Sequence, residues 1–138
     1  MATENHARVR YYSEKYNDIL FAEFTDSVKI DLELAKQIVA GRLDFAKEKK
    51  HYLIIDVSNA RQISTEAKEY LQRPDTGQKN VLGAAFIATN PVSALIAHIF
   101  IKTQKDFEAK CFTTEDEAFQ WILKYRKKNR PQNLITQA

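Results

Sequence analysis

Residues that could carry chemistry gather in one stretch of the chain, where hydroxyl and carboxylate side chains follow a run of large apolar residues. Asp56 and Ser58 end the apolar run, and Ser64 and Thr65 follow shortly after. A phosphate on a hydroxyl group here would add negative charge and so make or break a contact with another protein. The same hydroxyl groups also cap helices and shape turns, which is the competing interpretation. The stretch is therefore a candidate regulatory loop, with Thr65, Ser64 and Ser58 as candidate phosphate acceptors.

Three more polar residues of this stretch are candidates for shaping the loop or contacting a partner. Asp56 can accept hydrogen bonds that shape the loop, which we favour over a direct role in a ligand site. Asn59 lies in the same loop, and Glu66 follows Thr65 at the expected start of a helix. A phosphate is favoured at a helix start by the helix dipole, but Glu66 already places negative charge there.

Catalytic and metal-dependent functions find little support in the sequence. His6, His51 and His98 are scattered without the spacing of metal ligands, and 3 glycines are too few to build a loop that cradles phosphate. Cys111 has no activating partner nearby in the sequence. We therefore expect no enzyme activity, no cofactor and no metal site. A catalytic group assembled from distant residues is the alternative that one sequence leaves open.

Composition predicts a soluble, compact domain in the cytoplasm. The chain has 138 residues, 44% hydrophobic and 28% charged, which argues against disorder and coiled coils. The net charge of +3 is too small to predict nucleic-acid binding, and the basic clusters at 47–50 and 124–130 fall at expected carboxyl ends of helices. The single cysteine fits a reducing compartment. No signal peptide is expected, and the longest apolar stretch, residues 92–101, is too short to span a membrane.

Two strands covered on both faces are expected in the middle of a sheet, because residues 52–58 and 81–89 are apolar without alternation. Residues 8–12 and 18–24 are rich in aromatic and branched side chains and flank a polar break, which predicts a β-hairpin. A short strand is expected at residues 110–112. These patterns predict one mixed, mostly parallel β-sheet.

Four helices are expected to cover both faces of this sheet. Each follows a capping signal. The signals are Asp31, Ser64 or Thr65, Asn90 with Pro91, and Thr114 with Glu117. The predicted order is β, β, α, β, α, β, α, β, α. Residues 1–130 are expected to form a single α/β domain, and residues 131–138 to be a loose tail.

The third helix carries more apolar residues than one face can hold. Its side chains toward the sheet are expected to be Val92, Ile96, Ile99 and Phe100. The outer surface then holds Ala94, Leu95, Ala97, His98 and Ile101, and it is unusually apolar for a solvent-facing side. A second copy of the chain, a protein partner or a neighbouring helix of the same domain could cover it. We take Leu95, His98 and Ile101 as candidate contact residues.

The order of elements and residues 56–67 resemble the STAS domain family, typified by bacterial anti-sigma factor antagonists of the SpoIIAA type. Residues 56–60 match the first half of the sequence motif that follows the corresponding strand in the family. Where the family has an aspartate, a phosphorylated serine, a second serine and a glycine, this chain has Ser64, Thr65, Glu66 and Ala67. The chain is more similar to small uncharacterised bacterial proteins called STAS-like or SpoIIAA-like. These share the long first helix, the opening of the third helix and the ending at 112–122.

The resemblance implies a single STAS-like domain over residues 1–130 with a SpoIIAA-like fold, no established enzyme activity and regulation through protein contact. The leading hypothesis is a non-catalytic module that binds an unidentified protein through the loop from Asp56 to Ser64, the start of the second helix and the outer side of the third. A homodimer is a further expectation for that side. The alternative is a carrier of a small apolar ligand or lipid, because a STAS-like fold also resembles the Sec14 type. Its pocket would lie between the third helix and the small residues at 83–85.

Overall fold

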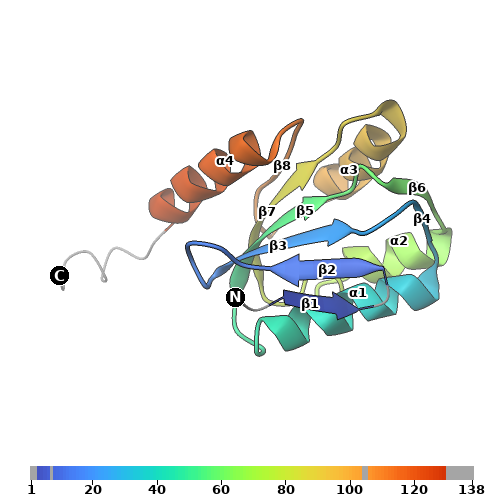
Figure 1. The fold of residues 1–138 in the computed structure, drawn as a ribbon, viewed down its shortest axis with the longest axis horizontal. Helices are drawn as coiled ribbons and strands as arrows, with labels where there is room; N and C mark the ends of the chain where they lie inside the picture. Colours follow the sequence, from blue (N-terminus) through green and yellow to red (C-terminus); the bar gives the residue numbers. More distant parts are fainter. Residues whose placement is uncertain (1–2, 7, 104–105, 130–138) are drawn as a thin grey trace.

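Figure 1 shows the computed structural model, which describes residues 3–6, 8–103 and 106–129. The tail predicted at residues 131–138 lies outside the described residues. Within them, six strands form one sheet in the order β1-β2-β3-β5-β7-β8. The strands are β1 (Thr3–His6), β2 (Val9–Tyr12), β3 (Ile19–Phe24), β5 (His51–Asp56), β7 (Val81–Ile87) and β8 (Ala109–Phe112).

The pairing of these strands follows the sequence pattern. β2 is antiparallel to both of its neighbours, β1 and β3, whereas β3, β5, β7 and β8 run parallel to one another. The predicted hairpin consists of β2 and β3, and β5 and β7 take inner positions in the parallel part of the sheet. Strands with helices on both faces need apolar side chains on both, so their sequences do not alternate. The mixed, mostly parallel sheet predicted from the sequence is confirmed.

A second sheet of two short parallel strands was not predicted. It pairs β4 (Val28–Ile30) with β6 (Ala60–Ile63). β6 lies inside the stretch that the sequence analysis treated as a loop, and β1 was also missed. All three strands have three or four residues, which is too short to show a period-2 pattern. The predicted order of elements therefore lacked these three strands.

The helices begin at the predicted caps. They are α1 (Leu32–Phe45), α2 (Thr65–Gln72), α3 (Pro91–Thr103) and α4 (Glu115–Lys128). The side chains of Asp31, Ser64, Asn90 and Thr114 each accept a hydrogen bond from the backbone N–H three residues later, at 2.8 to 3.2 Å. These bonds satisfy amides that have no partner inside the helix, so they fix where each helix begins.

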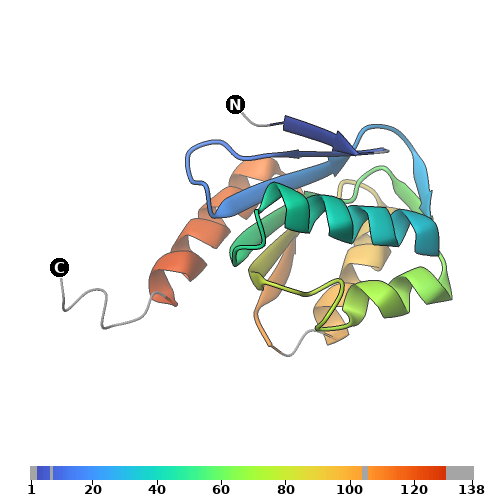
Figure 2. The ribbon, with the colours of Figure 1, turned by 90° about the horizontal axis from the view of Figure 1, so that it is seen from below.

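Helices cover both faces of the sheet, as its apolar inner strands require. α1, α2 and α3 pack on one face and α4 packs on the other (Figure 2). On the α4 face, the ring of Tyr125 lies over Gly83 and meets the Tyr52 ring edge-on, with 6.0 Å between centroids. A Cβ atom at Gly83 would clash with the Tyr125 ring. The core therefore consists of two apolar layers separated by the sheet.

The buried side of α3 differs from the prediction. Val92, expected to face the sheet, is 44% exposed, whereas Ala97, expected to face outward, is fully buried. Ser93 is buried as well, because its hydroxyl donates to Asn90 O at 3.0 Å and accepts from Asn90 N at 3.3 Å. A polar residue thus occupies part of the inner side. Ile96 is buried, and Leu95 and His98 are exposed, as predicted. Counting apolar residues therefore misplaced Val92 and Ala97 rather than the helix as a whole.

Candidate functional site

Two polar side chains after the apolar run of β5, those of Asp56 and Asn59, bond to backbone groups. Asp56 Oδ1 accepts a hydrogen bond from Ser58 N at 2.9 Å, so its side chain shapes the turn. Asn90 Nδ2 donates to Ser58 O at 2.8 Å, which joins this turn to the start of α3. Asn59 is exposed, and its Nδ2 donates to Phe24 O at 3.1 Å. Hydrogen bonds therefore connect this turn to the end of β3 and to the residue that caps α3.

The three candidate phosphate acceptors differ in accessibility. Ser58 Oγ is buried and makes no hydrogen bond with the described residues. Ser64 is half-buried, and its hydroxyl caps α2. Thr65 is exposed at the first position of α2, next to the exposed Glu66. Among the three candidate phosphate acceptors, Thr65 is therefore the exposed residue.

The candidate contact residues of α3 do not all share one side of the helix. Leu95 is 66% exposed, and His98 is exposed as well. Ile101 is half-buried and lies nine residues after Val92, which is about two and a half turns and so points to the opposite side. Half-buried Ile99, about two turns after Val92, shares its side. The exposed apolar stripe of α3 therefore consists of Val92, Leu95 and Ile99.

The α3 stripe adjoins only part of the stretch singled out in the sequence. α3 packs against β6, β7 and β8, whereas α2 packs mainly against α1. The turn at Ser58 and strand β6 thus lie beside α3, and the start of α2 follows β6. The structure brings Ser58 and Asn90 together, and it places Thr65 and Leu95 on different helices.

An apolar cavity lies between the sheet and helices α1, α2 and α3. It has a volume of about 80 Å³, and Ile38, Leu53, Phe86 and Ile96 are among its lining residues. A second cavity of about 50 Å³ shares five lining residues with it. The shared residues are Leu53, Leu71, Gly77, Phe86 and Phe100. The two cavities are therefore adjacent spaces on the α1–α3 side of the sheet.

The small residues at 83–85 do not create this space. Gly83 and Ala85 lie on the α4 face, where Tyr125 fills the room over Gly83. Ala84 lies on the other face and lines the second cavity. The pocket expected over all three residues is therefore corrected to a space lined mainly by Leu53, Phe86 and Phe100. Successive strand residues point to opposite faces, which the sequence argument overlooked.

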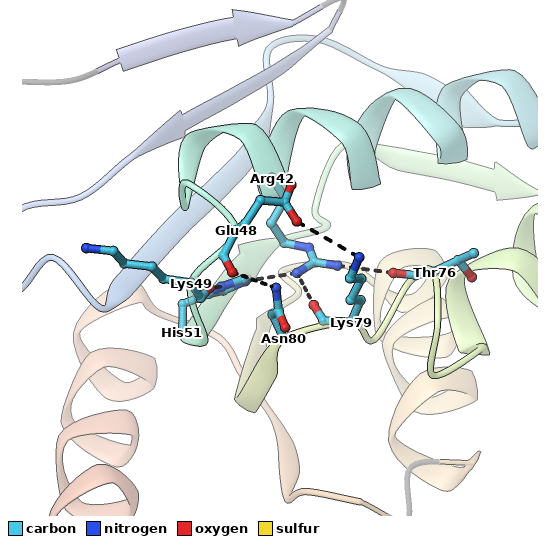
Figure 3. Close-up of polar contacts among 7 residues, drawn as sticks. All are labelled: Arg42, Glu48, Lys49, His51, Thr76, Lys79 and Asn80. Carbon is cyan, nitrogen blue, oxygen red and sulfur yellow. Dashed lines mark hydrogen bonds and ion pairs between the residues drawn. The ribbon is translucent and has the colours of Figure 1, made fainter.

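One polar cluster inside the protein was missed by the sequence analysis. Arg42 of α1 is 2% exposed, and His51 at the start of β5 is 1% exposed. Arg42 Nη1 donates to His51 Nε2 at 2.9 Å and to Lys79 O at 2.8 Å. Arg42 Nη2 donates to Gly77 O at 3.0 Å and to Thr76 O at 3.4 Å. Figure 3 shows the guanidinium reaching from α1 to the backbone that precedes β7.

The hydrogen bonds of this cluster fix the protonation of His51. Arg42 can only donate, so His51 Nε2 accepts, and Nδ1–H donates to Lys49 O at 2.8 Å. Burial lowers the pKa of His51 to about 4 and that of Arg42 to about 10. At neutral pH the cluster therefore holds a neutral imidazole and a charged guanidinium.

The sequence does contain a signal for the buried arginine. Arg42 lies four residues after Ile38 and three after Val39, so it shares their buried side of α1. The basic residues at 47–50, predicted to be a solvated helix end, lie just beyond this position, and His51, which has no metal-ligand spacing to the other histidines, is the partner of Arg42. A cation on the apolar stripe of a helix marks such a position.

Other candidate chemistry is sparse in the described part of the chain. No three histidine, cysteine, aspartate or glutamate side chains gather there in a way that could hold a metal ion. Burial raises the pKa of the half-buried Cys111 thiol, which disfavours the reactive thiolate. None of the helices in these ranges combines the length and hydropathy that crossing a membrane requires.

Comparison with known proteins shows the fold and the family. None of the curated proteins matches the sequence. The fold is similar to that of a solved structure described as an uncharacterized protein from the DUF3478 family with a SpoIIAA-like fold, from Shewanella loihica PV-4. The two share 18% sequence identity with a TM-score of 0.59, over 88% of this chain and 98% of that one.

This likeness shows a SpoIIAA-like fold, in agreement with the resemblance seen in the sequence. At that identity it extends to the fold alone. A family model matches residues 12–126, from the end of β2 into α4. The chain therefore belongs to the family described as Domain of unknown function (DUF7793).

Proposed function

We propose that this protein is a non-catalytic binding module that acts through contact with another protein, with α3 at the centre of the contact surface. The observation that carries the proposal is the exposure of Leu95 (66%) and Val92 (44%) on adjacent turns of α3. Burying a fully exposed side chain of this kind contributes about 1.5–3 kcal/mol, so a partner that covers these two partly exposed side chains gains a fraction of that from each. Exposed apolar groups that lie together on one element are typical of interaction sites.

A phosphate on Thr65 is the proposed switch of this module. Thr65 is exposed at the start of α2, where backbone amides without a helical partner can donate to a phosphate. The added charge would alter the surface next to β6, which packs against α3. Support for a non-catalytic role comes from the turn after β5, where Asp56 and Asn90 bond to backbone groups that shape the turn.

Affinity purification from the native cell tests the contact surface, with Leu95→Asp as the disrupting variant. Ala40 is exposed on α1, so Ala40→Asp places the same charge on a helix outside the proposed surface. We expect the partner to be recovered with the wild type and with Ala40→Asp, and lost with Leu95→Asp. Thr65→Glu should weaken recovery if phosphate is the switch. Equal recovery of the partner with the wild type and all three variants would refute the proposed contact surface on α3.

A second candidate function, the binding of a small apolar ligand, is favoured by the cavity under α1, α2 and α3. Its volume of about 80 Å³ is below the roughly 300–1,000 Å³ of pockets for drug-sized ligands. A Sec14-type lipid therefore requires the helices to part, whereas a small molecule does not. Native mass spectrometry of protein taken gently from its source cell tests this function. A noncovalent mass that disappears on denaturation supports it, and a bare chain argues against it.

A further inference from the structure

The wall of the apolar cavity contains one buried positive charge. Arg42 lines the cavity together with apolar side chains such as Ile38, Val39 and Phe100. Within the described ranges, no carboxylate forms an ion pair with its guanidinium. The negative charge of Glu48 acts to raise the pKa of Arg42, but Glu48 is exposed. Its carboxylate lies 3.9 Å from Lys79 Nζ (Figure 3). The guanidinium is thus surrounded by dipoles and lacks a counter-ion.

A buried cation without a counter-ion is unusual, because removing a charge from water costs free energy that a neutral partner offsets only in part. The terminal nitrogens of Arg42 bond to three carbonyls and to His51, and the bond to Thr76 O is long at 3.4 Å. No hydrogen bond from Arg42 Nε to a described residue accompanies them. Of the five N–H donors of the guanidinium, Nε–H therefore has no described partner, and the side chain lies beside an apolar space.

We infer that the cavity binds a small apolar carboxylic acid, whose carboxylate pairs with Arg42 and whose hydrocarbon part lies against Leu53, Phe86 and Phe100. This inference rests on the second candidate function. A carboxylate is the group whose planar geometry suits a guanidinium, and the pair is strengthened where water is excluded. The remaining walls of the cavity are apolar, so they select a hydrocarbon body rather than a second polar group.

The volume of the two cavities limits the size of the acid. They measure about 80 Å³ and about 50 Å³ and share Leu71 and Gly77. An engineered apolar cavity of roughly 150 Å³ binds benzene, so a single ring or a short alkyl chain is the appropriate scale. Benzoate and hexanoate are suitable probes, and benzyl alcohol and hexanol are uncharged controls of similar shape.

Calorimetric titration of the whole chain with these four compounds tests the inference. Because a hydrogen bond to a charged group is worth more than one between neutral groups, we expect each acid to bind at least about tenfold more tightly than its alcohol. Ala22 lies in the cavity wall, so Ala22→Ile fills part of the space and should abolish binding of acids and alcohols alike. Circular dichroism checks that this variant folds.

Two substitutions separate Arg42 from the surface charge beside it. Arg42→Gln removes the buried cation. This variant should bind each acid no more tightly than it binds the alcohol of similar shape. Lys79→Gln removes an exposed cation but keeps the backbone carbonyl that Arg42 contacts, and it should leave acid binding unchanged. If Arg42→Gln fails to fold, two other results test the inference. The affinity of acid relative to alcohol in the wild type tests the charge, and loss of binding in Ala22→Ile tests the location in the cavity.

The outcomes distinguish the two levels of the proposal. Binding of neither class of probe overturns the acid site and counts against the ligand-binding function. Equal binding of acid and alcohol, lost in Ala22→Ile, overturns the role of Arg42 and leaves a neutral ligand site. Acid binding that survives Ala22→Ile takes place outside the cavity and overturns the inference as well.

Discussion

At the scale of single residues, the buried pair of Arg42 and His51 is the chemically distinctive feature of this chain. The two side chains join α1 to the first residue of β5 and to the backbone before β7. Each bond satisfies a group that would otherwise be buried without a partner, which is costly. The cluster therefore ties together three segments that are far apart in the sequence, and His51 must stay neutral to accept from Arg42.

We predict that stability falls as pH drops from about 6.5 toward 4 and that His51 causes a large part of the loss. The pKa of His51 is lowered to about 4 from 6.5, chiefly by burial. Between these values the unfolded chain binds a proton that the folded chain does not, so stability rises with pH through this window. The contribution is on the order of 3 kcal/mol.

Denaturant unfolding of the wild type and His51→Gln across this pH range measures the effect. Glutamine can accept from Arg42 but does not titrate, so the variant should show a smaller loss of stability on acidification. If the free energy of unfolding falls with pH by the same amount in both proteins, protonation of His51 does not cause the loss. Other groups would then set the acid sensitivity.

At the scale of elements, close packing of α4 on β7 depends on a residue that has no side chain. The Tyr125 ring occupies the space over Gly83, and Tyr125 Oη accepts from Glu108 N at 3.2 Å. Trp121 stacks on the same ring with 5.2 Å between centroids. The ring is therefore held from several sides and has little room to move away from a new side chain.

We predict that Gly83→Ala destabilises the protein by about 1–3 kcal/mol through overpacking. Tyr125→Leu opens the same space at its own cost, and the double variant Gly83→Ala with Tyr125→Leu should lose less than the sum of the single losses. The coupling measured in this double-mutant cycle by chemical denaturation checks the contact. Additive losses would mean that the ring does not resist the new methyl group.

The sequence predicted those elements that carry their own periodic or capping signal. The inner strands, the hairpin and the four helix starts at Asp31, Ser64, Asn90 and Thr114 all have local causes. The short pair of β4 and β6 has none, because each strand is stabilised by the other across the chain. The exposure of individual residues on α3 and the Arg42 cluster also depend on tertiary contacts, which periodicity alone does not specify.

At the scale of the whole molecule, the two proposed functions use different parts of the fold. The protein contact uses the outer side of α3, where Leu95 is exposed, and ligand binding uses the inner side, where Ile96 and Phe100 line the cavity. One helix thus separates an outward surface from an inner space. A ligand that shifts α3 would therefore alter the surface that a partner meets, which makes the two functions compatible.

The exposed stripe of α3 is small for a self-association surface. Two side chains, Val92 and Leu95, reach an exposure above 40% on α3, whereas a stable dimer buries about 1,200–2,000 Å² in total. Half-buried Ile99 adds little further area. We therefore predict that the chain sediments as a monomer at micromolar concentration. Because the same area applies to any stable interface, a different protein that binds the stripe must also cover surface beyond these three side chains.

Sedimentation velocity over a hundredfold range of concentration, with Leu95→Asp and Ala40→Asp beside the wild type, tests this prediction. All three proteins should have the same monomeric sedimentation coefficient. A dimer that is lost in Leu95→Asp and kept in Ala40→Asp would contradict the prediction and assign the α3 stripe to a second copy of the chain. A dimer that persists in both variants would place self-association elsewhere and leave α3 available to another partner.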